Sequence, residues 1–282
     1  MIKRYFADAD NTITNAFDES LQIRGTGSNM GQSDILEVFS IYAQVSSSDG
    51  LSSELARVII QFPMTTVSSD ISNGTVPVDA SYFLKLYNAE HQFTLPRDYE
   101  LEVLAVSASW QEGLGLDMDN YSDLTYDVVG SNWIRRSGST AWDTQGADVH
   151  ASPIFNQSFD EGTEDLEVDV TSLVSQWHAG TKENYGFMIR LSSSLETQDR
   201  SYFTKKFFAR SSEFFFKRPV LEARWDGSIR DDRSNFYASS SLSPAADNLN
   251  TLYLYNYSRG RLANIPAIGT GQIFVNLHET LG

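Results

Sequence analysis

The stretch LEVDVTSLVSQWHAGTKENYGFMI, residues 166–189, carries the clearest structural pattern in the chain. Its first five residues alternate between apolar and acidic, which is typical of a strand with one buried and one solvated face. The next part places three apolar side chains on one side of a helix that ends at Gly180. The stretch therefore predicts a strand, a short helix over residues 169–180 and a second strand over residues 185–191. The helix would be capped by Thr171 and would bury Leu173, Val174 and Trp177.

Short apolar runs with a period near two recur through the rest of the chain, between clusters of Gly, Pro, Ser, Asn and Asp. This pattern predicts an all-β fold, a two-sheet jelly-roll-like sandwich, over residues 1–225. The sequence then turns polar, and we expect residues 226–282 to form a small second β module for docking or oligomerisation, because so short a piece has little core of its own. Further strands of the sandwich are expected at residues 34–42, 55–62, 82–87, 101–106 and 219–225.

The segment SYFTKKFFARSSEFFFKRPVLEARW, residues 201–225, gathers six basic residues and six phenylalanines. A helix lying on a membrane needs apolar residues spaced by three and four, and the interruptions at residues 211–213 and at Pro219 break that spacing. Two successive strands fit the segment better. Basic residues such as Lys205 and Arg224 are then expected on solvated strand faces, where lysine also discourages unwanted edge pairing.

The composition excludes several classes of function. The chain has 282 residues, a formal net charge of −16 and no cysteine. Nucleic-acid binding needs a basic docking face, so this charge argues against such a partner. The absence of cysteine excludes disulfides and thiol chemistry. We expect no membrane partner either, since the sequence shows neither an apolar window of spanning length nor a signal-peptide pattern.

The local patterns of catalytic and metal sites are weak. The stretch RGTGSNMG lacks dinucleotide or phosphate-loop spacing and is interpreted as a flexible turn. The four histidines are not at metal-ligand spacing, so we predict no metal, no cofactor and no enzyme activity. Two carboxylates that converge for glycoside hydrolysis remain an open alternative. The oxygen-bearing loop residues Asp117, Asp119, Asn120 and Asp123 suggest calcium but lack the EF-hand order. Together with Asp8 and Asp10 they are interpreted as solvated loop residues.

Two groups of aromatic residues are candidates for binding. Trp133 and Trp142 lie among Gly, Ser, Arg and Asp, and they are the candidate glycan-binding platforms because flat aromatic faces stack on sugar rings. Packing beneath a loop is the favoured interpretation for both, and an exposed platform is the alternative. Aromatic side chains also anchor protein interfaces, and the tyrosines of LYLYNY share one strand face. The candidate interface residues are Phe214, Phe215, Phe216, Tyr253, Tyr255 and Tyr257.

Eight segments taken in order resemble the DNRLRE-type domain, a β-sandwich similar to carbohydrate-binding modules. The resemblance spans residues 7–225, and its most specific part lies around Trp177, Asn184, Tyr185 and Gly186. It implies a jelly-roll sandwich used as a structural or adhesive module, without catalytic residues to carry over. The segments are ADNTIT, NMGQSDILEV, LARVIIQF, DASYFLKLYNA, VSASWQEG, TAWDTQGAD, VDVTSLVSQWHAGTKENYGFMI and RPVLEARW.

The chain also resembles uncharacterised virion structural proteins of tailed marine phages, which combine such a domain with no leader, no cysteine and many Ser, Asn and Thr residues. The resemblance implies a non-enzymatic structural protein of a phage virion, assembled in the host cytoplasm and displayed on head, neck or tail. Its partners would be other virion proteins and further copies of itself. A carbohydrate-binding surface adhesin, with a host-surface glycan as ligand, is the alternative, and a polysaccharide-degrading enzyme is the third.

Overall fold

The structure is a computed structural model, and the chain divides into two units, Met1–Asp226 and Gly227–Gly282. Unit 1 is described almost throughout, and unit 2 only in short pieces. The described residues are 1–18, 20–48, 50–92, 95–116, 130–227, 242, 244, 252–253 and 257–262.

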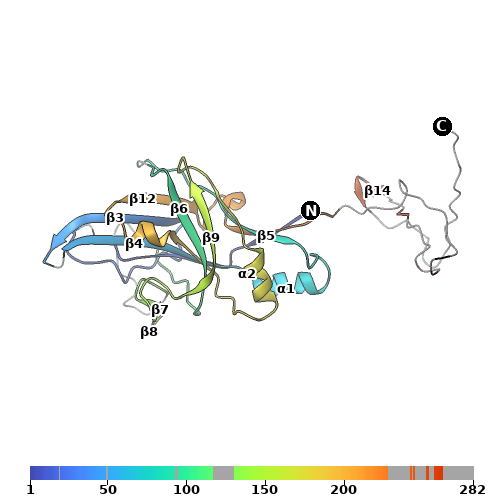
Figure 1. The fold of residues 1–282 in the computed structure, drawn as a ribbon, viewed down its shortest axis with the longest axis horizontal. Helices are drawn as coiled ribbons and strands as arrows, with labels where there is room; N and C mark the ends of the chain where they lie inside the picture. Colours follow the sequence, from blue (N-terminus) through green and yellow to red (C-terminus); the bar gives the residue numbers. More distant parts are fainter. Residues whose placement is uncertain are drawn as a thin grey trace. The chain divides into compact units, whose positions relative to one another are not determined.

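Unit 1 is a sandwich of two antiparallel sheets (Figure 1), which confirms the predicted all-β fold class. Sheet A has the strand order β1 (Ile2–Phe6), β13 (Val220–Arg224), β5 (Ser81–Leu86) and β10 (Leu166–Asp169). Sheet B has the order β12 (Tyr202–Phe208), β3 (Ile35–Ser47), β4 (Gly50–Gln61), β11 (Phe187–Leu191), β6 (Tyr99–Val106) and β9 (Val149–Phe159), and β2 (Ala9–Thr14) also pairs with β4.

The pattern of residues 166–189 predicts the local structure correctly. In β10 Leu166 and Val168 are buried while Glu167 and Asp169 are exposed, and β10 pairs with β5. Helix α2 (Thr171–His178) buries the three predicted apolar side chains. Its N-terminus differs from the expectation, because the Thr171 hydroxyl does not cap the helix. That hydroxyl donates to Asp169 Oδ1 (2.6 Å) and accepts from the Tyr82 amide (2.8 Å), so it ties the helix to β5.

The main core lies between the sheets. Sheet B contributes side chains such as Val58 and Ile60, and sheet A contributes Leu84 and Leu221, all of them fully buried. Each such aliphatic side chain stabilises the fold by roughly 1.5–3 kcal/mol relative to exposure in water. Helix α1 (Met64–Ser72) was not expected from the sequence. It lies beside α2 at one end of the sandwich (Figure 1) and is held by its buried residues Met64 and Val67.

A second core covers the outer face of sheet B. Strands β4, β6 and β11 present Ile59, Leu104 and Met188 on that face, and residues from the long connection between β6 and β9 pack on them. This connection contains the short hairpin β7 (Arg135–Ser137) and β8 (Thr140–Ala141), and helix α3 (Ser193–Glu196) follows β11. The sandwich therefore has a partial third layer made of loop.

Residues 201–225 form two successive strands, β12 and β13, which belong to different sheets. The connection between them, residues 209–219, passes from sheet B to sheet A and contains a single 3-10 turn, η1 (Phe215–Lys217). Unit 2 has two short paired strands among its described residues, β14 (Tyr257–Ser258) and β15 (Arg261–Leu262). No helix in the described part of the chain is long and apolar enough to span a bilayer.

Candidate interaction surface

Trp133 and Trp142 are not exposed platforms. Their exposed fractions are 5% and 4%, and both belong to the second core. The Trp142 indole N–H donates to the Asn132 carbonyl oxygen (2.8 Å), and the Arg57 guanidinium lies 5.0 Å from the ring centre of Trp133. The apolar outer face of sheet B must be covered, and the polar connection folds back over it with both indoles inward. The interpretation as exposed glycan platforms is therefore wrong, and the favoured interpretation, packing beneath a loop, describes both residues.

Phe214, Phe215 and Phe216 are exposed. Their exposed fractions are 54%, 48% and 83%, far above those of the core aromatics. Phe215 and Phe216 lie in the turn η1, and Phe214 directly precedes it. Backbone hydrogen bonds such as the one from the Lys217 amide to the Phe214 carbonyl (2.8 Å) hold this turn. A turn of this kind leaves three consecutive rings outward, whereas a strand would turn alternate side chains into the core.

Two further phenylalanines join this trio. The ring centres of Phe6 and Phe215 are 4.7 Å apart, those of Phe208 and Phe214 are 5.5 Å apart, and those of Phe215 and Phe216 are also 5.5 Å apart. We call the five rings the aromatic surface. It joins the last residue of β1 and the last residue of β12 through the β12–β13 connection. The sequence identified Phe214, Phe215 and Phe216. Phe6 was missed because it is distant from them in the sequence, and Phe208 because it belongs to the strand β12 rather than to the turn.

Two cations of this segment stack on the same rings. The Lys217 ammonium lies 4.9 Å from the ring centre of Phe208, and the Arg218 guanidinium lies 5.5 Å from that of Phe215. Arg218 also donates to the Ser212 carbonyl oxygen (2.8 Å). Cation–π contacts keep these side chains along the rings. The mixture of Phe, Lys and Arg in the sequence therefore produces one surface rather than separate polar and apolar faces.

The β12–β13 connection is anchored by a cluster of partly buried polar and charged side chains. The backbone amide of Arg210 donates to Asp10 Oδ2 (2.6 Å), and the Arg210 guanidinium donates to both oxygens of Glu112 (2.8 Å each). Burial raises the pKa of Asp10 to about 7. Asp10 was expected to be a solvated loop residue, but it lies in β2 and is fully buried. Asp8, by contrast, is exposed.

Lys205 also differs from the expectation of a solvated strand face. Its exposed fraction is 1%, and its ammonium donates to Asn88 Oδ1 (2.7 Å) and to the carbonyl oxygens of Gly162 (3.1 Å) and Glu164 (2.7 Å). A bulge in β12 between Tyr202 and Lys205 changes the register that alternation predicts. Burial lowers the pKa of the Lys205 ammonium to about 8. This lysine fastens the loop after β9 to the sandwich.

The stretch RGTGSNMG is a tightly bonded loop rather than a flexible turn. Asn29 is buried, and its amide group donates to the carbonyl oxygens of Glu112 (2.6 Å) and Ser131 (2.7 Å). A Cβ on Gly113 or on Gly130 would lie within 2.5 Å of this side chain, and both glycines have positive φ. Asn29 therefore clamps together the two ends of the segment 113–130. The suggested calcium-loop residues Asp117, Asp119, Asn120 and Asp123 lie outside the described residues.

The predicted tyrosines of unit 2 are only partly described. Tyr253 and Tyr257 have exposed fractions of 40% and 63%. Tyr255 lies outside the described residues. The shared face that alternation predicts for these three side chains stays a prediction.

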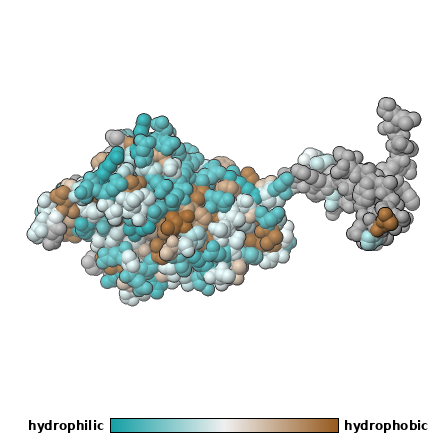
Figure 2. Space-filling view, in the orientation of Figure 1, coloured by the Kyte–Doolittle hydropathy of each residue, from teal (hydrophilic) through white to brown (hydrophobic). Residues whose placement is uncertain are grey.

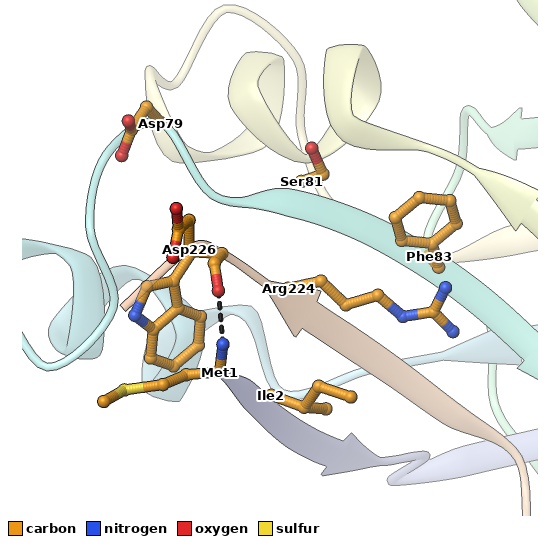
Figure 3. A pocket seen from close by; sticks show the side chains of 8 residues that line it. Met1, Ile2, Asp79, Ser81, Phe83, Arg224 and Asp226 are labelled. Carbon is orange, nitrogen blue, oxygen red and sulfur yellow. Dashed lines mark hydrogen bonds between the residues drawn. The ribbon is translucent and has the colours of Figure 1, made fainter. Parts of the chain in front are cut away.

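An open pocket of about 510 Å³ lies at the ends of β1, β5 and β13 in sheet A (Figure 3). Trp225 and Phe83 supply aromatic lining, and Asp79 and Asp226 supply carboxylates. The Arg224 guanidinium lies 4.2 Å from the ring centre of Phe83. It also pairs with Glu167 and Glu222, so the predicted outer-face residue is ion-paired rather than merely solvated. The sequence did not reveal this pocket, because residues far apart in the chain line it.

Several buried or partly buried acidic residues of unit 1 pair with arginines. Arg57 donates to both oxygens of Glu196 (2.9 and 2.6 Å), and Arg190 pairs with Glu102 (2.9 Å). Burial opposes ionisation of Glu222, but hydrogen bonds from Arg224 and Arg4 outweigh it and lower the pKa of this carboxyl. Among the described residues no group of three or more His, Asp or Glu side chains is placed to hold a metal ion.

Comparisons with known proteins return no relative from which a function can be transferred. No family model matches the chain, and no curated protein matches it significantly.

Proposed function

We propose that this chain is a non-enzymatic structural protein of a phage virion, displayed on the head, neck or tail, and that it acts through protein–protein contacts made by the aromatic surface. The virion setting comes from the resemblance to DNRLRE-type domains of phage structural proteins. The mode of action comes from the exposed rings of the β12–β13 connection.

The observation that carries the proposal is the exposure of Phe214, Phe215 and Phe216. Figure 2 shows that hydrophobic residues on the visible face of unit 1 form separate patches among hydrophilic ones. Isolated apolar residues are normal on a protein surface, but contiguous aromatic patches mark interaction sites. Aromatic residues and arginine are also the side chains enriched at the centres of interfaces. The surface therefore has the composition of a contact site.

The surface is held in place before any partner binds. Its connection is fastened to β2 and to the loop after β6 by the Arg210 contacts with Asp10 and Glu112, and its outer rings pack on Phe6 and Phe208. A surface that is already ordered loses little conformational entropy when a partner binds. The order of this surface favours a permanent structural contact over a contact made by a segment that folds only on binding.

The test measures incorporation into particles. A tagged full-length chain is expressed in host cells during infection, and its copies per purified particle are counted by mass spectrometry. The wild-type chain should be present at a fixed ratio to the major capsid protein. The variant Phe215→Ser/Phe216→Ser should be incorporated about tenfold less, since losing two interface aromatics weakens binding by at least about 1.4 kcal/mol.

The matched control is Phe203→Ser, which removes a ring that is 52% exposed on β12 but lies outside the aromatic surface. Its incorporation should equal that of wild type. Absence of the wild-type chain from particles would refute the virion setting. Equal incorporation of the double variant would refute the role of the aromatic surface.

A second candidate function is glycan binding in the pocket of Figure 3, as in a carbohydrate-binding surface adhesin. The observation in its favour is the lining of indole, phenyl ring and carboxylates from Trp225, Phe83, Asp79 and Asp226, since sugars are bound by aromatic stacking with polar groups around it. Glycan-array binding that is lost in Trp225→Ala and kept in Phe203→Ala would support it. If wild type binds no glycan, or if both variants bind equally, this candidate fails.

A further inference from the structure

A buried lysine and an asparagine side chain meet where the two sheets of unit 1 come together. Asn88 follows β5 of sheet A, and Lys205 lies in β12 of sheet B. The Lys205 ammonium donates to Asn88 Oδ1 (2.7 Å), although the two residues are 117 positions apart in the sequence. A lysine amine is a nucleophile, and a carboxamide is a group that it can attack. The contact therefore brings together the two groups from which an amide cross-link can form.

The backbone holds these two side chains in position. The chain that continues β5 runs beside β12, and Asn88 forms an antiparallel bridge with Phe207. On one side of this bridge the Phe208 amide donates to the Tyr87 carbonyl oxygen (3.0 Å). On the other side the Ala89 amide donates to a carbonyl oxygen of β12 (3.0 Å). The pair is therefore ordered before any reaction, and such ordering removes much of the entropic barrier to bond formation.

The lysine nitrogen lies close to the carbon that it would attack. A carbonyl oxygen is about 1.23 Å from its carbon, so the 2.7 Å contact with Oδ1 places Nζ at most about 4 Å from Asn88 Cγ. Reacting atoms that are ready for attack are about 3–3.5 Å apart. A small rotation of the asparagine side chain covers the difference.

The other contacts of Lys205 orient its nitrogen. Nζ also donates to the carbonyl oxygens of Gly162 (3.1 Å) and Glu164 (2.7 Å), which belong to the loop after β9. A neutral amine has two N–H groups and one lone pair. When Lys205 loses a proton, the two backbone carbonyls can keep both N–H groups. The lone pair then faces the carboxamide of Asn88.

Burial makes the neutral amine accessible near neutral pH. Lys205 is 1% exposed, and its Nζ lies 5.0 Å from the ring centres of both Phe159 and Phe207. Burial lowers the pKa of Lys205 to about 8, against the opposing charges of Glu164 and Asp165. At about pH 8 roughly half of these amines are therefore neutral, whereas an ordinary lysine with a pKa of about 10.4 is almost fully protonated.

We propose that Lys205 and Asn88 form an amide bond between their side chains and so tie sheet A covalently to sheet B. The neutral Nζ attacks Asn88 Cγ, the new bond from Nζ to Cγ forms, and the bond from Cγ to Nδ2 breaks. One proton moves from Nζ to the departing nitrogen, which leaves as ammonia, so no other reactant is needed. Until the bond forms, Lys205 acts as a hydrogen-bond donor.

The cross-link would give the sandwich a covalent tie that it otherwise lacks. The chain contains no cysteine, so no disulfide joins its sheets. A bond between positions 117 residues apart closes a long loop and restricts the unfolded chain. This inference does not depend on the proposed function.

The test is mass spectrometry of the full chain after incubation at about pH 9, where the neutral amine predominates. Wild type should lose the mass of one ammonia. Asn73, which precedes a glycine, can also lose ammonia by forming a succinimide, so the identity of the joined peptides decides. Trypsin digestion of the unfolded chain should release residues 86–97 attached to residues 201–206, because trypsin does not cleave after an acylated lysine.

Three variants define the reacting pair. Lys205→Met should give no joined peptides. Asn88→Asp keeps an acceptor for the ammonium, but an ionised carboxylate resists attack by an amine, so it should give none either. The matched control Lys206→Met removes the neighbouring lysine, which pairs with Glu37, and should link as wild type does. Circular dichroism checks that each variant is folded, and linked wild type should melt roughly 10 °C above unlinked wild type.

The rate of linking should rise about tenfold between about pH 7 and pH 9, as the neutral fraction of Lys205 grows. His91, on the segment after β5, has a lowered pKa and is neutral throughout this range, so it does not shape the profile.

Several outcomes overturn the proposal. If folded wild type yields no joined peptides after prolonged incubation at about pH 9, Lys205 is a structural hydrogen-bond donor and nothing more. Joined peptides that contain another lysine or another asparagine also overturn it. Equal linking in a chain kept unfolded by urea does so as well, because the folded geometry would then have no part in the reaction.

Discussion

Truncation of Trp142 tests whether the outer layer of sheet B is a true core. The indole is 4% exposed and packs with Ile59, Leu104 and Met188. A buried tryptophan removes roughly 200 Å² from water, worth about 5 kcal/mol at about 25 cal/mol per Å². Partial collapse of the cavity reduces the cost, and measured values for such truncations are about 3–5 kcal/mol. We expect Trp142→Ala to lower the free energy of unfolding by about 4 kcal/mol.

The assay is urea unfolding followed by circular dichroism, with Trp142→Phe as the matched variant. Phenylalanine keeps most of the ring packing but leaves the Asn132 carbonyl without its donor, so its cost should be only about 1–2 kcal/mol. A loss below about 1 kcal/mol in Trp142→Ala would refute the reasoning. It would mean that the connection carrying Trp133 and Trp142 does not contribute to the core and leaves both rings accessible.

Two further predictions concern buried charges. Lys205→Met should lower the free energy of unfolding by about 2–4 kcal/mol, because three oxygen acceptors lose their donor and relief of ammonium burial offsets only part of that loss. In the same urea assay the control Lys206→Met should lower it by less than about 1 kcal/mol, since Lys206 is more exposed and forms an ion pair with Glu37. Asp10, whose pKa rises from 3.8 to about 7 on folding, keeps a proton that the unfolded chain releases, so it makes stability fall as pH rises from about 4 to 7. Asp10→Asn should reduce the dependence of the unfolding free energy on pH across that range. If this dependence is the same in the variant and in wild type, the burial argument is contradicted.

Strands with regular alternation were the most predictable part of the fold. Leu166 to Asp169 alternate strictly, and β10 has that burial pattern. The adjacent helix was predictable because its apolar residues share one side and Gly180, with positive φ, follows its end. Local periodicity determines both elements, so no knowledge of distant contacts was needed.

The environments of individual charged and aromatic residues were not predictable in the same way. Lys205 is buried because a bulge shifts its register and because Asn88 and the loop after β9 supply its acceptors, and neither cause is visible near it in the sequence. Trp133 is buried because a polar connection folds over a sheet made of distant strands. For the interaction surface, the exposed phenylalanine trio was identified from composition, whereas its contacts with Phe6 required the pairing of β1 with β13.

The contacts of Asn29 hold Gly113 and Gly130 close together in the fold. Gly113 and Gly130 approach each other at this side chain, so the chain returns to the point from which it departs. An insertion between those two fixed points then has a small entropic cost, because the entropy of closing a loop grows only slowly with its length. This position is accordingly suited to the grafting of foreign peptides, with Asn29 and the two glycines retained.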